Sequence, residues 1–134
     1  MIALTGCGSG DRRVSHARYA HTLETTIEHL DRVILVRARG RATPVAIRSL
    51  ARAVDAGAAR LDGLRPPREA ESGNDELVCA LHAYALDLRD FALELRLSPA
   101  ARREAALRLA HSAAMRAIQR AEADLARAGY PLQI

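Results

Sequence analysis

Apolar residues recur every three or four positions along most of the chain, which is the period of an α-helix with one buried side. Four stretches show this period. Their apolar stripes are Ala20, Leu23, Ile27, Leu30, Ile34 and Ala38; Ile47, Leu50, Val54, Ala58 and Leu61; Leu77, Leu81, Tyr84, Leu88, Phe91 and Leu95; and Leu107, His111, Ala114, Ile118, Ala121 and Leu125. A helix with a single stripe must bury it against another element.

Capping and helix-breaking residues delimit these stretches. The first runs from about residue 11 to 39, and Gly40 is a typical C-terminal cap. The second and the fourth begin at Thr43-Pro44 and Ser98-Pro99. At both places a hydroxyl can cap the helix, and proline is well tolerated at the first helical position. Two further helix starts are therefore predicted with a physical reason for each.

The second and fourth helices are expected to end at Gly63 and Gly129. The polar segment Arg68–Gly73 then reads as a connector, and Asn74 or Asp75 as the cap of the third helix. Long helices joined by short turns reverse direction at each turn. The pattern therefore predicts an all-α fold, an antiparallel up-down-up-down four-helix bundle formed as one domain by residues 11–134.

Composition agrees with helices packed on helices. Aromatic residues make up only 3% of the chain and tryptophan is absent, which is unfavourable for a β-sandwich. The net charge is +4, and all 20 basic residues are arginine, as a GC-rich genome would produce. Arg37, Arg39 and Arg41 are clustered, but no recognition helix or stacking aromatics accompany them, so no nucleic-acid partner is expected.

The stretch Leu4-Thr5-Gly6-Cys7 resembles a bacterial lipobox, in which an aliphatic residue and two small residues precede the cysteine that receives lipid. Residues 8–10 then resemble a flexible tether. Residues 1–10 are thus interpreted as the remnant of a lipoprotein signal, and Cys7 as the lipidation site. A complete signal needs about 7–15 apolar residues before the cut, so we expect the coding region to begin upstream. Without such a segment, the protein would be cytoplasmic.

Two runs in the body of the chain, ATPVAIRSLARAVDAGAARLDGLRPPREA and ELVCALHAYALDLRDFALELR, carry a resemblance to a known group. The matching positions are Leu61, Leu64, Pro66, Pro67, Ala83 and Tyr84. They resemble the proline-proline hinge and alanine-tyrosine pair of small helical actinobacterial lipoproteins of unassigned function. The resemblance implies a membrane-anchored, extracytoplasmic bundle and supplies no catalytic residues.

Two features favour binding. His111 lies in the predicted seam of the fourth helix, so an internal ligand pocket near His111 and Tyr84 is one hypothesis; a histidine hydrogen-bonded at the seam edge is the alternative. Cys79, Leu86 and Leu93 lie one heptad apart on the outward side of the third helix. They form a possible face for a homodimer or a protein partner, or else scattered surface residues.

No pattern of an enzyme or a cofactor site stands out. His21, Glu24 and Glu28 share one side of the first helix, but the order differs from the Glu-x-x-His pairs of di-iron bundles, so a solvated face is favoured and no metal is expected. No catalytic triad order or phosphate loop is present. We therefore predict a binding or scaffolding protein, with a cytosolic interaction module or a small-ligand-binding bundle as alternatives.

Overall fold

The computed structural model describes residues 12–40 and 42–132, except for the side chains of residues 37–39. This part of the chain is helical and contains no strand. The helices are α1 (His16–Arg39), α2 (Pro44–Asp62), α3 (Arg68–Glu94), α4 (Pro99–Ala110) and α5 (Ala113–Arg127). The predicted all-α class is confirmed, and the fourth predicted helix is present as two consecutive helices.

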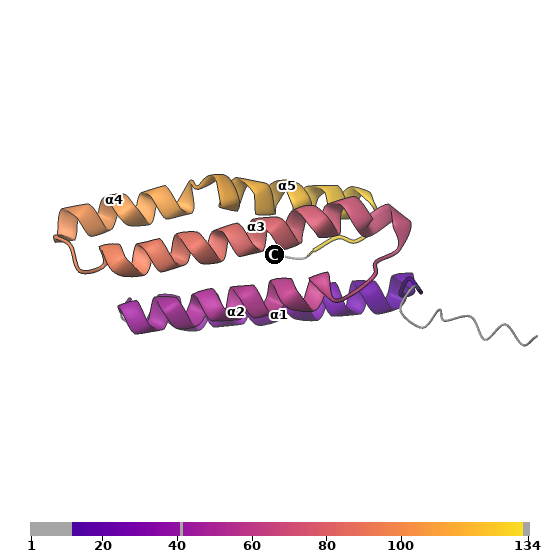
Figure 1. Cartoon of the computed structure of the whole chain (residues 1–134), viewed down its shortest axis with the longest axis horizontal. Helices are drawn as coiled ribbons and strands as arrows, with labels where there is room; N and C mark the ends of the chain where they lie inside the picture. Colours follow the sequence, from indigo (N-terminus) through magenta and orange to yellow (C-terminus); the bar gives the residue numbers. More distant parts are fainter. Residues whose placement is uncertain (1–11, 41, 133–134) are drawn as a thin grey trace, which may run out of the picture.

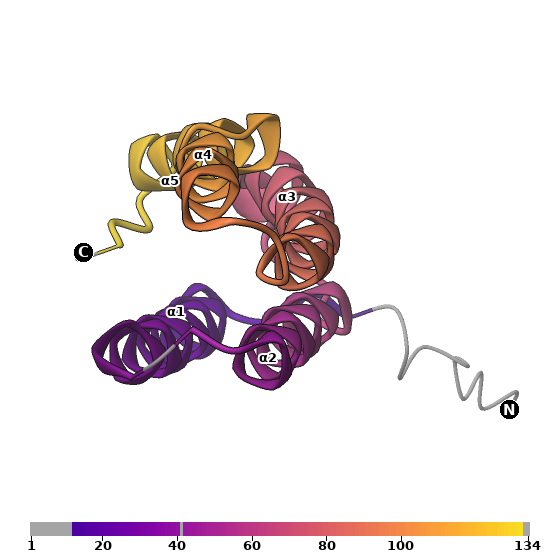
Figure 2. The same cartoon turned by 90° about the vertical axis from the view of Figure 1, so that its left-hand side faces the viewer.

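The helices lie lengthwise beside one another (Figure 1). Figure 2, viewed along the helices, shows α1 and α2 as one layer and α3, α4 and α5 as the other. Contacts follow the order of the chain: α1 packs on α2, α2 on α3, and α3 on both α4 and α5. Helices α4 and α5 follow one another along the same side of α3 (Figure 1).

The predicted caps at Thr43, Ser98 and Gly129 are present. Thr43 and Ser98 accept hydrogen bonds from the backbone N–H groups three residues later, at 3.1 and 3.3 Å. Gly129 has a φ of 101°, the left-handed conformation that glycine adopts without strain. The N–H groups of Gly129 and Tyr130 donate to the carbonyls of Ala126 and Leu125, which is the Schellman motif. Glycine is therefore required at position 129.

The prediction for the start of the third helix is wrong. Residues 68–73 are the first turns of α3 instead of a connector, and Asn74 is a buried helical residue instead of a cap. Two features make the segment helical. Pro66-Pro67 places proline just before the helix, and Glu69 and Glu71 are acidic residues in its first turn, where the helix dipole favours them.

The prediction of one continuous fourth helix is also wrong, because the chain breaks at His111-Ser112. The Ser112 hydroxyl accepts a hydrogen bond from the Met115 N–H at 3.1 Å and begins α5. Helix α4 buries only Ala105, whereas α5 buries a full stripe. The break lets α5 pack its stripe against α3 independently of the direction of α4. Leu107 of α4, which was predicted to be buried, is exposed.

The core lies between the two layers. It is built mainly of leucine, isoleucine and alanine, and the whole predicted stripe of α2 is buried in it. Tyr19 and Tyr130 are also buried, with their rings packed edge to face at a centroid distance of 5.1 Å. Among the described residues, no helix is long and apolar enough to span a lipid bilayer.

Polar contacts tie together the end of the molecule at which α1 begins. The Val14 N–H donates to the Arg65 carbonyl at 2.8 Å, and Arg13 Nη1 donates to the Pro66 carbonyl at 3.0 Å. Arg13 also pairs with Glu71 at 3.1 Å. The segment before α1 is therefore fastened to the loop between α2 and α3.

Candidate ligand-binding cleft

A cleft of about 240 Å³ lies between α1 and α5, and its lining is mainly apolar. Helices α1 and α5 pack on α2 and α3 respectively, and they belong to different layers of the molecule (Figure 2). The lining residues are Ile27, Leu30, Asp31 and Ile34 of α1; Val54 of α2; Leu81 and Tyr84 of α3; and Met115, Ile118, Gln119 and Glu122 of α5. Four helices therefore contribute to one site.

The helical stripes explain the apolar lining. Ile27 and Leu30 belong to the buried stripe of α1, and Ile118 to that of α5. All three residues also line the cleft. The same periodicity that builds the core thus leaves part of two stripes facing the cleft. Ile34, farther along α1, is 39% exposed.

Two carboxyl groups line the cleft from opposite helices, Asp31 on α1 and Glu122 on α5. Burial raises the pKa of both groups. The negative charge of Asp31 raises the pKa of Glu122 further. Among the described side chains, neither carboxyl group forms an ion pair or hydrogen bond. The cleft therefore combines an apolar lining with two uncompensated negative charges.

Tyr84 is the third titratable residue of the cleft. Burial raises the pKa of its phenol, and the negative charge of Asp87 adds to the effect. The phenol is therefore protonated at neutral pH and can donate a hydrogen bond. Gln119, on α5, adds an amide that can both donate and accept. The cleft thus has a few polar groups around an apolar interior, which is the usual make-up of a small-molecule site.

The structure separates the two residues of the predicted pocket. Tyr84 lines the cleft, as just described, but His111 does not. His111 is exposed at the C-terminal end of α4, where its carbonyl accepts a hydrogen bond from Arg116 Nη1 at 2.6 Å. The expected seam position is wrong because the helix ends at this residue. His111 is therefore not part of the candidate site.

Asp31 and Glu122 were missed by the sequence reasoning. Each lies next to an apolar stripe, where a charged residue usually marks the edge of the solvent-exposed face. Asp31 directly follows Leu30 of the α1 stripe, and Glu122 directly follows Ala121 of the α5 stripe. Their position beside the stripe was the sequence feature that could have identified them, but many charged residues of amphipathic helices have the same position. Only the pairing of α1 with α5 makes these two residues neighbours.

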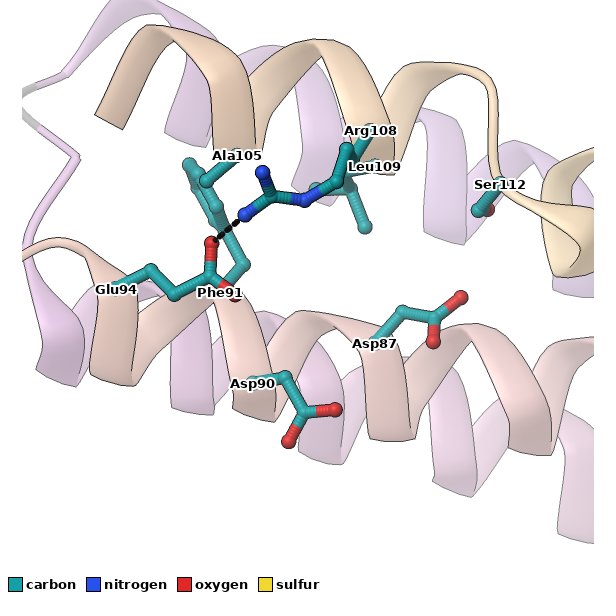
Figure 3. A pocket seen from close by; sticks show the side chains of 8 residues that line it. All are labelled: Asp87, Asp90, Phe91, Glu94, Ala105, Arg108, Leu109 and Ser112. Atoms are coloured by element: carbon teal, nitrogen blue, oxygen red, sulfur yellow. Dashed lines mark hydrogen bonds and ion pairs between the residues drawn. The ribbon is translucent and has the colours of Figure 1, made fainter. Parts of the chain in front are cut away.

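A second hollow, of about 270 Å³, lies between α3 and α4 and is shown in Figure 3. Glu94 of α3 reaches toward α4 and pairs with Arg108 at 2.6 Å. Asp87 also projects toward α4, whereas Asp90 points away from it (Figure 3). In the described part of the chain, no three histidine, cysteine or carboxylate side chains are grouped to hold a metal ion. Because the charge of Glu94 is already neutralised by Arg108, this hollow is the weaker candidate for a ligand-binding site.

The predicted partner face on α3 is exposed. Leu86 and Leu93 are 62% and 64% exposed, and Cys79 is an exposed free cysteine. Cys79 borders a wide groove of about 630 Å³ between α3 and α5, which is lined largely by alanines. Binding of a second copy or another protein to this face stays a prediction. His21, Glu24 and Glu28 are also exposed, as expected for a solvated helix face.

Cys7, the predicted lipidation site, lies outside the described residues, as do residue 41 and the side chains of residues 37–39 in the arginine cluster. Comparison of the chain with protein-family models, curated proteins and solved structures found no match.

Proposed function

We propose that this protein is a non-enzymatic binding protein, an up-down-up-down four-helix bundle whose cleft between α1 and α5 binds a small, largely apolar molecule. The observation that carries the proposal is the cleft itself, a recess of about 240 Å³ with a mainly apolar lining and a few polar groups. The reversal of chain direction between successive long helices, which can be followed by colour in Figure 1, supports the bundle topology.

The volume of the cleft limits the ligand. An engineered apolar cavity of about 150 Å³ in another protein binds benzene, whereas drug-sized ligands occupy about 300–1,000 Å³. At about 240 Å³, this cleft suits one substituted aromatic ring or a short branched alkyl group. Tyr84 and Gln119 provide hydrogen-bonding groups that could orient such a molecule.

Binding can be tested with the neutral probe phenethyl alcohol. We expect its addition to raise the melting temperature and to shift the NMR signals of Met115 and Ile118, which line the cleft. Substitution Met115→Trp should fill the cleft and abolish both effects. Leu107→Trp is the matched control, because Leu107 is exposed on α4 and does not line the cleft. Shifts that persist in Met115→Trp would place the probe elsewhere and contradict the proposal.

We also propose that the bundle is held at the outer face of a membrane by lipid on Cys7. The support is the lipobox-like stretch of residues 4–7 and the polar residues that follow it. Two or more acyl chains would make such an anchor stable, since a single chain binds only marginally.

The anchor can be tested in the native host by partitioning between detergent and water. Wild-type protein should enter the detergent phase, and Cys7→Ser should stay in water. Cys79→Ser is the control, since it removes the other cysteine and should partition like wild type. Unmodified Cys7 in wild-type protein from the host would favour the alternative, a cytosolic interaction or regulatory module.

A further inference from the structure

We propose that the ligand of the α1–α5 cleft is a small organic cation, an ammonium group attached to an aromatic or alkyl body. This inference rests on the proposed binding function and adds the charge of the ligand to it. The feature that carries it is the pair Asp31 and Glu122, which lines an otherwise apolar cleft from two facing helices.

Asp31 and Glu122 have no cationic partner among the described side chains. Some other carboxylates of the described chain do pair with arginine: Asp55 with Arg89 at 2.6 Å, and Glu94 with Arg108 at 2.6 Å. The chain has 20 arginines, so cations are abundant along its helices. None of the described arginine side chains pairs with Asp31 or Glu122. The two charges are left facing the cleft, available to a cation from solution.

Electrostatics then decide which ligand charge is favoured. A partly buried carboxylate loses hydration, and a second carboxylate nearby adds repulsion; the raised pKa values of Asp31 and Glu122 agree with both effects. An ammonium group between them would relieve the repulsion and form charge-assisted hydrogen bonds. An anionic ligand would increase the repulsion. A neutral ligand would leave it unchanged.

The rest of the lining selects the body of the ligand. Leu30, Val54 and Ile118 supply apolar contacts, and the aromatic ring of Tyr84 lines the same cleft. A metal ion or a hydrated inorganic cation would leave these groups without contacts. An organic cation with an apolar body satisfies both parts of the site, and the volume limits that body to about one aromatic ring.

The test compares two probes of nearly equal shape, phenethylamine and phenethyl alcohol, with the full chain by calorimetry or NMR titration at neutral pH. We expect the amine to bind at least about tenfold more tightly than the alcohol. The double variant Asp31→Asn with Glu122→Gln should remove this preference and keep binding of the alcohol. Glu104→Gln, an exposed carboxylate of α4 outside the cleft, is the control and should keep the preference.

Acidification gives a second readout. The groups that face the cleft are Asp31 from α1, Tyr84 from α3 and Glu122 with Gln119 from α5, whereas α2 contributes only Val54. Phenethylamine and Tyr84 stay protonated throughout the acidic range, so only the two carboxyl groups change charge. The amine should therefore lose its advantage as pH falls and Asp31 and Glu122 take up protons.

The outcomes separate this inference from the proposed function. Equal affinity for the amine and the alcohol would overturn the inference and leave a neutral-ligand cleft. A preference for the amine that survives the double variant would also overturn it, because the amine would then bind elsewhere. Absence of binding by either probe would contradict the inference and the proposed function together.

Discussion

Asn74 joins three helices through one side chain. It lies in α3 and is 2% exposed, its Oδ1 accepts a hydrogen bond from the Tyr19 hydroxyl of α1 at 2.7 Å, and its Nδ2 donates to the Leu61 carbonyl of α2 at 3.3 Å. The Leu61 carbonyl is in the last turn of α2, outside the regular helical hydrogen-bond pattern, and it also accepts a hydrogen bond from the Leu64 N–H at 3.3 Å. Asn74 therefore satisfies a helix end and a buried hydroxyl at once.

The first prediction concerns this contact. Asn74→Ala should lower the free energy of unfolding by about 2 kcal/mol, because the buried Tyr19 hydroxyl loses its acceptor and the Leu61 carbonyl loses one of its hydrogen bonds. Tyr19→Phe should lower it by about 1 kcal/mol, since it removes a hydroxyl and leaves the packing. Urea unfolding measures both. The double variant should lose less than the sum of the single losses. Strict additivity would show that the hydrogen bond contributes nothing.

The second prediction concerns Gly73, at the contact of α3 with α5. A Cβ atom at this position would lie 2.9 Å from two side-chain atoms of Leu125. Gly73→Ala should therefore lower stability by about 1 kcal/mol, because overpacking outweighs the gain in helix propensity. Gly63→Ala is the control: its Cβ would approach nothing closer than 3.4 Å, and its φ is −72°. A Gly73→Ala variant as stable as Gly63→Ala would contradict the prediction.

At the scale of elements, α4 differs from its neighbours. Only Ala105 of its residues is buried, and the helix packs on α3 alone among the described elements with substantial contacts. Its ion pair between Arg108 and Glu94 is exposed and adds little stability. Helix α5, in contrast, buries Ala114, Ile118, Ala121 and Leu125. The break at Ser112 thus separates a weakly held helix from a core helix.

The third prediction follows from this difference. Backbone amides of α4 should exchange with deuterium faster than those of α3 and α5, because local opening of α4 exposes little apolar surface. Hydrogen exchange followed by mass spectrometry or NMR measures the rates. Protection of α4 equal to that of α5 would show that the two helices unfold as one unit, as a single continuous helix would.

The sequence predicts elements well where local chemistry decides. Helix α2 has a hydroxyl cap, a proline at its first position and a stripe that is entirely buried, and its prediction is confirmed. Where tertiary packing decides, prediction is less complete. In the sequence, Gly73 looks like a helix breaker, but it lies inside α3. A residue without a side chain fits there because Leu125 of α5 packs closely against it. Ser112 is a good cap, yet its signal is hidden inside a longer helical period.

The candidate site is less predictable than the helices. Tyr84 was identified as a pocket residue, but Asp31 and Glu122 were not. Periodicity tells which side of a helix is buried, but it does not tell which helices leave a gap between them. That depends on how α1 and α5 are spaced by the helices they pack on. A site formed between helices distant in sequence therefore needs the tertiary arrangement.

At the scale of the whole molecule, Asp55 on one side and the pair Asp31 and Glu122 on the other have opposite effects on how stability depends on pH. Burial opposes ionisation of Asp55, but hydrogen bonds from His82 and Arg89 overcome it and hold its pKa below the ordinary value. The pKa values of Asp31 and Glu122 are raised. A lowered pKa contributes stability above the unfolded-state pKa, lost as pH falls through the folded-state value. A raised pKa contributes stability at low pH, lost as pH rises through the folded-state value.

The fourth prediction is that substitutions at these places change stability in opposite directions near neutral pH. Asp55→Asn should lower the melting temperature, because it removes a favourable charge between α2 and α3. Asp31→Asn with Glu122→Gln should raise it, because it removes two unfavourable charges. The effect of the Asp31 and Glu122 variant should shrink toward pH 4, because the pKa values of these groups are raised, whereas the effect of Asp55→Asn should persist to lower pH, because the pKa of Asp55 is lowered. Thermal unfolding followed by circular dichroism checks the signs. A drop in melting temperature for the Asp31 and Glu122 variant would show that these carboxylates stabilise the empty cleft.

The contacts of Arg13 and Val14 also determine how the molecule responds to mechanical force. A pull on the chain before Arg12 reaches the loop between α2 and α3 first, through the Arg65 and Pro66 carbonyls, and not the first turn of α1. Two hydrogen bonds and the ion pair between Arg13 and Glu71 must then break before α1 can separate from the bundle. A chain held at a surface by its N-terminal end would thus keep its helices assembled under tension.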